Sequence, residues 1–325
     1  MRSPVVFFLT LLAAVSASAS AKAQGVEAWP DQPVRIIVPF PAGGPADIVS
    51  RFVGERLSAK WGQPVVIENK PGANTTVAAV QVARATPNGL TLFVVMDVTM
   101  VLNPLTNKSL PYDPQRDFAP ITMLSKNTSL LTVHADGPKT LQELVALGRA
   151  NPGKLNFGAG IITTRLAGEM FNREMGITAQ FVPYQGSPPT VQALLSKSVD
   201  FIVDGQATSL PLIEAGKFRA LAKLNEGPVP SLPQLRSLAV EANAPGLEDI
   251  STWIALVAPA QTPNRIIDKV QKDVAEIYAD RELTGRLLKA GINAQGSTPE
   301  GLVRFVESET KRWSKVVSEA GIELN

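Results

Sequence analysis

Four short segments of the sequence place small and polar residues where a predicted strand gives way to a predicted helix. The first contains Gly43 and Gly44, and the second contains Gly160 followed by Thr163 and Thr164. The unpaired N–H groups of a helix start, together with the positive end of the helix dipole, bind anions without a charged side chain. These segments therefore indicate the binding of a small anion.

The first segment, FPAGGPADIV, has the composition of a backbone that approaches a ligand closely. Gly43 and Gly44 carry no Cβ that would obstruct such an approach. Pro45 suits a first helical turn, and Asp47 is expected to accept N–H bonds from the helix. Taken alone, the segment is equally compatible with an ordinary strand-to-helix turn.

The second segment, GAGIITTRLAGE, lacks the third glycine of a dinucleotide-binding loop, and the strand after it ends without an acid for a ribose. Nucleotide binding is therefore disfavoured. Arg165 stands in the first helical turn, where a cation opposes the helix dipole by roughly 0.3–1 kcal/mol. A bound carboxylate would offset this cost through a bidentate contact. The alternatives are a solvated side chain and a pair with Glu169, four residues later.

The third and fourth segments, VPYQGSPPTV and VDGQATSLP, offer hydroxyl, amide and backbone donors, with helix capping as the alternative role. Their polar residues are Tyr184, Gln185, Gly186, Ser187, Gln206, Thr208 and Ser209. Asp97 follows a further predicted strand and is a candidate acceptor for a ligand amine, although an aspartate there also suits a turn. In open α/β sheets these strand ends meet at one crevice, which predicts a shared site.

The elements that must position these segments alternate between short β-branched runs and longer helical patterns, as in a mostly parallel α/β sheet. Strands are predicted at 34–40, 64–69, 90–96, 155–160, 179–184, 200–204, 218–224 and 252–259. Helices are predicted at 45–60, 75–85, 139–150, 165–175, 190–198, 209–217, 263–278 and 299–317. Crossovers near 124–131 and 249–256 divide the chain into a discontinuous first lobe, 24–124 and 254–325, and a second lobe, 125–253.

The N-terminus predicts export. Arg2 precedes an apolar run, Val5 to Val15, and residues 1–23 end in an Ala-x-Ala cleavage pattern. The apolar run is too short to span a bilayer, and no later segment approaches about 20 apolar residues. Cleavage would leave 302 of the 325 residues, enough for about two domains.

Composition excludes several classes of function. Without Arg2 and Lys22, the chain has 29 basic and 29 acidic residues, so it lacks the basic excess that nucleic-acid binding requires. It has no cysteine, which excludes disulfides and thiolate sites. The one histidine, His134, lies at a predicted strand end, which disfavours zinc sites and Ser/His/Asp triads. We predict neither a metal nor a cofactor.

An ordered series of motifs resembles the Bug family, the extracytoplasmic solute-binding receptors of tripartite tricarboxylate transporters. The series comprises WPDQPVRIIVPFPAGGPADIVSR, GQPVVIENKPGA, LPYDPQRDFAPIT, PGKLNFGAG, LAGEMF, FVPYQGSPP, IEAGKFRALA, STWIALVAPAQTP and RWSKVVSEAGI, and it covers nearly the whole chain after the export segment. The resemblance implies a two-lobed periplasmic-binding-protein fold (type II-like) that closes by a hinge on a dicarboxylate, tricarboxylate, acidic amino acid or aromatic acid.

The resemblance also assigns site residues. In the family, a Pro-x-Gly-Gly loop holds a carboxylate through backbone groups and ordered water, a role that falls on Ala42, Gly43, Gly44 and Asp47. Contacts from the second lobe fall on Gly160, Thr163, Thr164, Tyr184, Gly186, Ser187 and Gln206.

The chain departs from the family pattern at four positions. Ile161 and Ile162 stand where small polar residues are common, and Arg165 replaces a frequent histidine. Asp97 stands where small or hydroxyl residues are frequent. One hypothesis is that the isoleucines contact an apolar part of the ligand while Arg165 binds its far carboxylate. Arg165→Ala would then weaken binding at least tenfold, about 1.4 kcal/mol.

The sequence thus predicts a monomeric, non-catalytic periplasmic protein that captures a small organic acid and presents it to a membrane permease. A sensory subunit that docks on a receptor kinase remains an alternative, because it would use the same closed form. A carboxylate-based enzyme using Asp47, Asp97 and Asp204 is disfavoured, because no nucleophile–base pair accompanies these acids.

Overall fold

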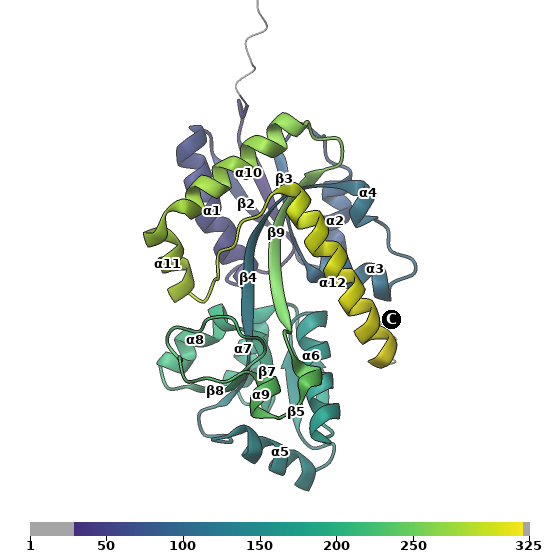
Figure 1. The fold of residues 1–325 in the computed structure, drawn as a ribbon, viewed down its shortest axis with the longest axis vertical. Coiled ribbons are helices and arrows are strands. Elements are labelled where there is room, and N and C mark those ends of the chain that lie inside the picture. The colour runs from purple at the N-terminus through teal and green to yellow at the C-terminus, as the bar shows by residue number, and fades with distance from the viewer. Residues whose placement is uncertain (1–28, 321–325) are drawn as a thin grey trace, which may run out of the picture.

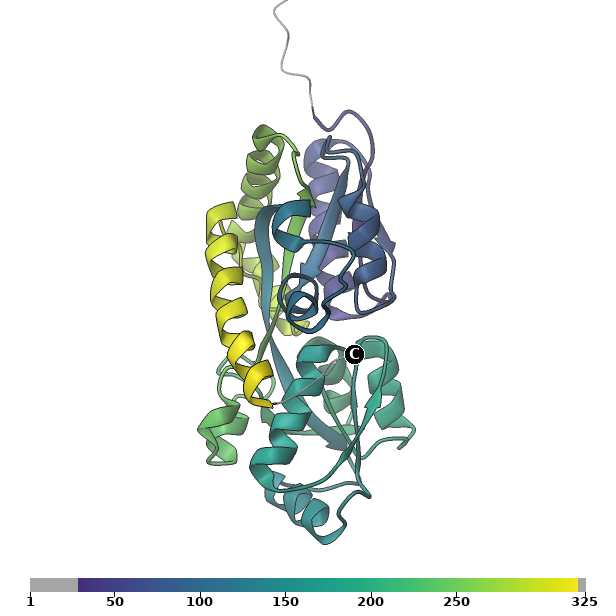
Figure 2. The same cartoon turned by 90° about the vertical axis from the view of Figure 1, so that its right-hand side faces the viewer.

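One mixed sheet runs through both lobes of the molecule in the computed structural model, which describes residues 29–320 (Figure 1). Its strand order is β2-β1-β3-β9-β4-β7-β5-β6, and β8 pairs with β4 beside this path. The predicted two-lobed α/β fold is confirmed, and Figure 2 shows the lobes stacked along the long axis. The predicted export segment, residues 1–23, lies outside the described residues.

The first lobe contains three parallel strands and the antiparallel strand β9. The strands are β1 (Val34–Val38), β2 (Val65–Asn69), β3 (Thr91–Met96) and β9 (Ser251–Pro259). The helices on its faces are α1 (Pro45–Trp61), α2 (Thr76–Ala83), α10 (Asn264–Ala279), α11 (Arg281–Lys289) and α12 (Pro299–Ala320). Ile36 and Val38 pack in the core cluster that includes α1 and α10, whereas Ile37 packs in the cluster on the opposite face with α2. Burial on both faces explains why Ile36, Ile37 and Val38 are consecutive apolar residues, whereas Arg35 in the same strand is exposed.

The second lobe repeats the same construction. Its strands are β5 (Asn156–Ala159), β6 (Gln180–Pro183), β7 (Phe201–Gly205) and β8 (Phe218–Lys223). Its helices are α5 (Leu141–Ala150), α6 (Ile162–Met175), α7 (Ser187–Leu195), α8 (Gln206–Glu214) and the short α9 (Leu238–Glu241). Strand β5 runs parallel to both β6 and β7, so that the loops leading into α6, α7 and α8 open at the same edge of the sheet.

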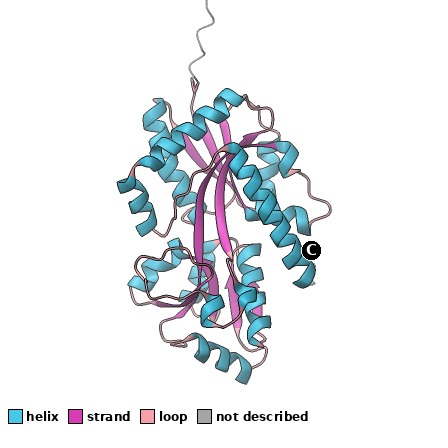
Figure 3. Cartoon of the chain, viewed as in Figure 1, coloured by secondary structure: helices cyan, strands magenta, loops and turns pink. Residues whose placement is uncertain are grey.

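Strand β4 (Phe118–His134) connects the lobes (Figure 3). Its residues 118–128 pair antiparallel with β9, and residues 129–134 pair antiparallel with β7 and β8. Because β4 and β9 both pass from one lobe toward the other, they form a two-stranded link along one side of the loops that face between the lobes (Figures 1 and 2). The boundaries at residues 124 and 253 stay predictions.

The structure corrects three features of the predicted element pattern. The predicted strands omit β4, although His134, its last residue, was expected at a strand end. Helices α6, α7 and α8 each begin three residues before the predicted start, so that residues expected in loops form first helical turns. Three helices, not two, close the chain: α11 was missed because only Leu283 and Leu287 of its nine residues are buried, which leaves a weak apolar signal. Asp280 caps this helix by accepting a hydrogen bond from the Leu283 N–H.

Four short elements complete the described part of the chain: the π-helical turn Val98–Leu102, the helices α3 (Asn103–Thr106) and α4 (Pro114–Asp117), and the 3-10 helix Pro245–Leu247. Among residues 29–320, no helix combines the length and the apolar character needed to cross a membrane. Over the same residues, no group of three or more histidine, aspartate or glutamate side chains is arranged to hold a metal ion.

Candidate ligand-binding site

The N-termini of four helices meet at one cavity between the lobes. Gly44, Ile161, Gly186 and Gly205 are the N-cap residues of α1, α6, α7 and α8, and all four line this cavity. None of the four caps makes a side-chain hydrogen bond to its helix. Pro45 in α1 and Pro188 and Pro189 in α7 have no N–H group, but the other first-turn N–H groups keep their capacity to bind an anion. The helix dipoles favour negative charge there.

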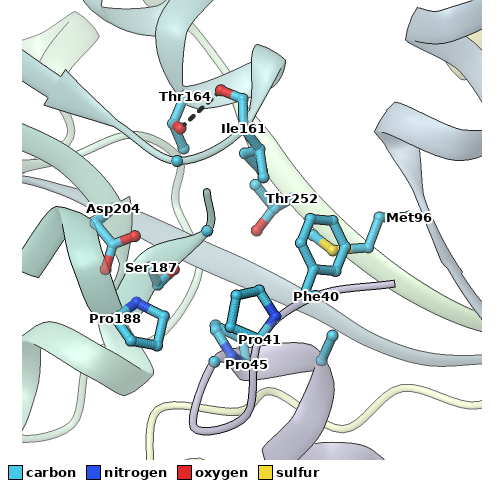
Figure 4. Close-up of a pocket in the computed structure, with 15 residues that line it drawn as sticks. Phe40, Pro41, Pro45, Met96, Ile161, Thr164, Ser187, Pro188, Asp204 and Thr252 are labelled. Carbon is cyan, nitrogen blue, oxygen red and sulfur yellow. Dashed lines mark hydrogen bonds between the residues drawn. The ribbon is translucent and has the colours of Figure 1, made fainter. Parts of the chain in front are cut away.

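We call this space the inner cavity (Figure 4). It measures about 30 Å³, which is room for about two water molecules. Its walls come from both lobes and are mostly apolar: Phe40, Pro41, Gly44, Pro45, Ala46, Met96, Gly160, Ile161, Thr164, Gly186, Ser187, Pro188, Asp204, Gly205 and Thr252.

A larger space, the outer cavity, adjoins it and shares Phe40, Pro41, Gly160, Ile161 and Gly186 with it. Its volume of about 390 Å³ lies in the range of small-molecule sites. Its further walls are Pro39, Pro71, Gly72, Ala73, Asn74, Thr75, Val98, Pro183, Tyr184 and Gln185. Together the two cavities offer backbone donors at the inner end and more space at the outer end.

The first-lobe loop is fixed by Asp47. Its Oδ2 accepts hydrogen bonds from the Gly43 N–H at 3.0 Å and from Arg51 Nε at 2.9 Å, and its Oδ1 accepts from Asn69 Nδ2 at 3.0 Å. Burial by itself would raise the pKa of Asp47, but the hydrogen bonds from Arg51, Gly43 and Asn69 lower it below its ordinary value. The expectation that Asp47 accepts N–H bonds from its helix is wrong, because the carboxylate turns back to the preceding loop. Asp47 thus positions the loop, while Ala42 and Gly43 are exposed beside it.

Gly160 and Gly186 let two second-lobe loops touch. The Gly186 N–H donates to the Gly160 carbonyl at 2.9 Å, and Gly186 adopts a φ of +87°. A Cβ on Gly160 would stand 2.4 Å from the Gly186 carbonyl carbon. Only glycine therefore allows this approach, which brings the N-termini of α6 and α7 to the same cavity.

The two threonines of the second segment have different surroundings. Thr164 lines the inner cavity, and its hydroxyl donates to the Ile161 carbonyl at 3.1 Å (Figure 4). Thr163 is fully buried and donates its hydroxyl to Asp97 of the first lobe. The second Asp97 oxygen accepts from the Val98 N–H at 2.9 Å. Neither Thr163 nor Asp97 lines the two cavities, and burial raises the pKa of Asp97 to about 7.

Arg165 forms an ion pair with Glu169, one of the alternatives that the sequence left open. Its Nε lies 2.7 Å from Glu169 Oε1, and its guanidinium stacks 4.8 Å from the centre of the Phe181 ring. The residue lines neither cavity. Its assignment as a ligand contact stays a prediction.

The remaining predicted contacts divide between the cavities and the core. Ser187 lines the inner cavity, and Tyr184 lines the outer one. Gln206 is fully buried away from both, with its Nε2 donating to the Pro228 carbonyl at 3.3 Å and its Oε1 unpaired.

Several lining residues were not predicted as ligand contacts. Asp204 entered the sequence reasoning only as a possible catalytic acid, although the Asp-Gly pair at a strand end was a usable signal. Phe40, Met96 and Thr252 carry no such signal, because apolar and hydroxyl side chains at strand ends are common in cores. Asn74 and Thr75 are marked in the structure by positive φ values of 47° and 74°.

Comparison with known proteins supports the reading of the fold. Residues 49–322 match the model of the family described as "Tripartite tricarboxylate transporter family receptor". A relative in Pseudomonas sp. (strain P51), the UPF0065 protein in the tcbD-tcbE intergenic region, is 31% identical over 317 residues, 97% of this chain and 94% of its own. BugT of Bordetella pertussis is 29% identical over 309 residues, 92% of each chain.

Solved structures agree with this relationship. An R. palustris protein with adipate is 33% identical, with a TM-score of 0.87 over 90% of this chain and 99% of that one. MatC from Rhodopseudomonas palustris with bound malate is 30% identical, with a TM-score of 0.80 over 89% and 100%. The periplasmic binding protein BugD is 30% identical, with a TM-score of 0.84 over 91% and 99%.

Proposed function

Because the chain belongs to the family of tripartite tricarboxylate transporter receptors, which includes the Bug proteins, we propose that it captures a small carboxylate between its lobes. The observation that carries the proposal is the convergence of four uncapped helix N-termini on one cavity. A carboxylate there receives backbone N–H bonds and four favourable dipoles without needing a basic side chain.

The ligand class follows from the two cavities and from the relatives. Adipate and malate, seen with two proteins at least 30% identical to this chain, are both dicarboxylates. One carboxylate fits the donors of the inner cavity, and the outer cavity offers room for the rest of the molecule. The family supports a route from this binding to transport: the closed receptor presents its ligand to a membrane permease from the periplasm.

Closure requires a hinge, which we place in β4 and β9. Their pairing is irregular between Pro120 and Thr122 and between Met123 and Ser125, where extra residues allow the strands to bend. Ligand binding then shifts an open–closed equilibrium, because only the closed form brings all four helix starts to the ligand.

Calorimetric titration of the full chain with adipate and malate tests this function. We expect at least one of them to bind, with the neutral diamide of the same chain length binding at least tenfold more weakly, because it lacks the charge that the helix starts favour. Equal binding of the diamide, or no binding of either acid, contradicts the proposal.

Gly160→Ala provides a variant that is specific to the site. The new Cβ meets the Gly186 backbone, separates the α6 and α7 starts, and should weaken binding at least tenfold. Gly285→Ala is the matched control, because a Cβ at Gly285 in α11 has no atom within 4 Å. We expect its affinity to equal that of the unmodified protein.

A further inference from the structure

Asp204 places an acid in the wall of the inner cavity. It is the last residue but one of β7, is almost completely buried, and turns its carboxyl group toward Ser187 (Figure 4). It is the one ionisable side chain among the described residues that line this cavity. A site proposed to hold a carboxylate thus already contains a carboxyl group of its own.

The described residues around Asp204 supply hydrogen bonds and helix N-termini but no positively charged side chain. Burial raises its pKa to about 6, while hydrogen bonds from Ser187, Thr208 and the backbone of Gly205 act in the opposite direction. Without a cation beside it, the carboxylate has no partner that would neutralise a second negative charge in the same space.

The charged groups on the packed elements are engaged elsewhere. On α1, Arg51 binds Asp47, and on α6, Arg165 binds Glu169. Helix α7 and strand β5 contain no ionisable side chain within their bounds, and Glu214 stands at the far end of α8 from Asp204.

The same holds along the two strands that carry and flank Asp204. Strand β4 carries Lys126, which pairs with Asp249, and His134, which contacts Asp136, while Asp204 itself faces Leu130 of this strand. Asp200, at the opposite end of β7, accepts a hydrogen bond from the Asn156 N–H. None of these groups neutralises the charge of the Asp204 carboxylate, so only a proton can do so.

We infer that a carboxylate enters the inner cavity together with one proton from solvent, which Asp204 and the ligand then share in a hydrogen bond. The inference rests on the proposed function. Two carboxylates in one small, mostly apolar cavity repel each other, whereas an acid–carboxylate pair attracts, as when two carboxyl groups share one proton in an aspartic protease. Asp204 thereby makes the receptor favour its ligand at lower pH.

The test is calorimetric titration of the full chain with adipate and malate from pH 6 to pH 8.5, in buffers with different ionisation enthalpies. We expect the affinity of the unmodified protein to fall by up to tenfold per pH unit above about pH 6, with proton uptake approaching one per ligand. The dependence of the heat on the buffer reports this proton directly and needs no variant.

Asp204→Asn should bind with an affinity that does not change over this range and exceeds that of the unmodified protein at pH 8. Asp200→Asn, the same change at the other end of β7, should keep the full pH dependence. Binding without proton uptake, or loss of binding in Asp204→Asn at every pH, overturns the inference and leaves the receptor function in place. Absence of binding by both acids in every buffer instead overturns the proposed function.

Discussion

Two buried aspartates stand at equivalent places in the two lobes, yet their surroundings differ. Asp97 follows the end of β3 and Asp204 lies at the end of β7, and burial raises the pKa of both. Asp97 is closed off by the Thr163 hydroxyl from the opposite lobe. Asp204 takes its hydrogen bonds from its own lobe and faces the inner cavity.

The role of a buried aspartate therefore depends on whether its carboxyl group faces a protein donor or an open cavity. A buried acid with a protein donor across the interface holds the lobes together. A buried acid with open space in front of it remains available to a ligand. Substitutions that treat the two aspartates alike should therefore separate stability from binding.

The largest effect is expected from Asp97→Asn on the pH dependence of stability. Burial raises the pKa of the Asp97 carboxyl to about 7, from 3.8 for an unperturbed aspartate. The contribution of this carboxyl to stability is therefore full below about pH 4 and is lost as the pH rises through 7. The difference in the free energy of unfolding, Asp97→Asn minus the unmodified protein, should therefore increase by about 4 kcal/mol between pH 4 and pH 8.

Asp204→Asn sharpens this result. Its pKa of about 6 predicts a smaller gain of about 3 kcal/mol, completed one pH unit lower. Urea unfolding at a series of pH values measures both variants. If the free energy of unfolding of each variant varied with pH in the same way as that of the unmodified protein, these two carboxyl groups would not be a source of the pH dependence.

An intermediate effect is expected from the hydroxyl donors. Thr163→Val removes the hydroxyl that faces Asp97 and leaves that carboxylate with the Val98 N–H, at a cost of about 2 kcal/mol at pH 8. Thr208→Val leaves Asp204 with Ser187 and should cost about 1 kcal/mol. Urea unfolding of both variants at pH 8 measures the two losses of unfolding free energy. Equal losses would show that the Thr163–Asp97 contact between the lobes stabilises the protein no more than the Thr208–Asp204 contact within one lobe.

The smallest effect is expected from Arg165→Ala. Because the guanidinium binds Glu169 and stacks on Phe181 outside both cavities, we expect ligand affinity to change by less than about threefold. Titration with adipate or malate measures it. A loss of tenfold or more would restore Arg165 as a contact to the far carboxylate.

Much of the fold was predictable from local pattern. Strands β1 and β3 are short and rich in apolar residues, with Arg35 and Thr91 as their polar members, and α1 begins at the proline that follows Gly43 and Gly44. The starts of α6, α7 and α8 were misplaced by three residues because threonine, serine and glutamine suit a loop and a first helical turn almost equally.

The candidate site was predictable only in part. The glycines that cap the helices could be recognised, since each stands between a strand pattern and a helix pattern. Whether a polar side chain next to them faces the cavity or the core depends on its rotation about the helix axis. Gln206 turned into the core and Ser187 toward the cavity, although both begin a helix after a glycine.

The sequence by itself determined the alternation of strands and helices and the four segments in which small and polar residues stand between a strand and a helix. These features depend on neighbours within about four residues, where glycine, proline and the apolar period act directly. Only the tertiary structure decided that the four starts share one cavity, that Thr163 reaches Asp97, and that Asp204 faces the space between them. The strand order brings residues from both lobes together, and no local pattern encodes a contact between residues as distant in the sequence as Asp97 and Thr163, which are 66 positions apart.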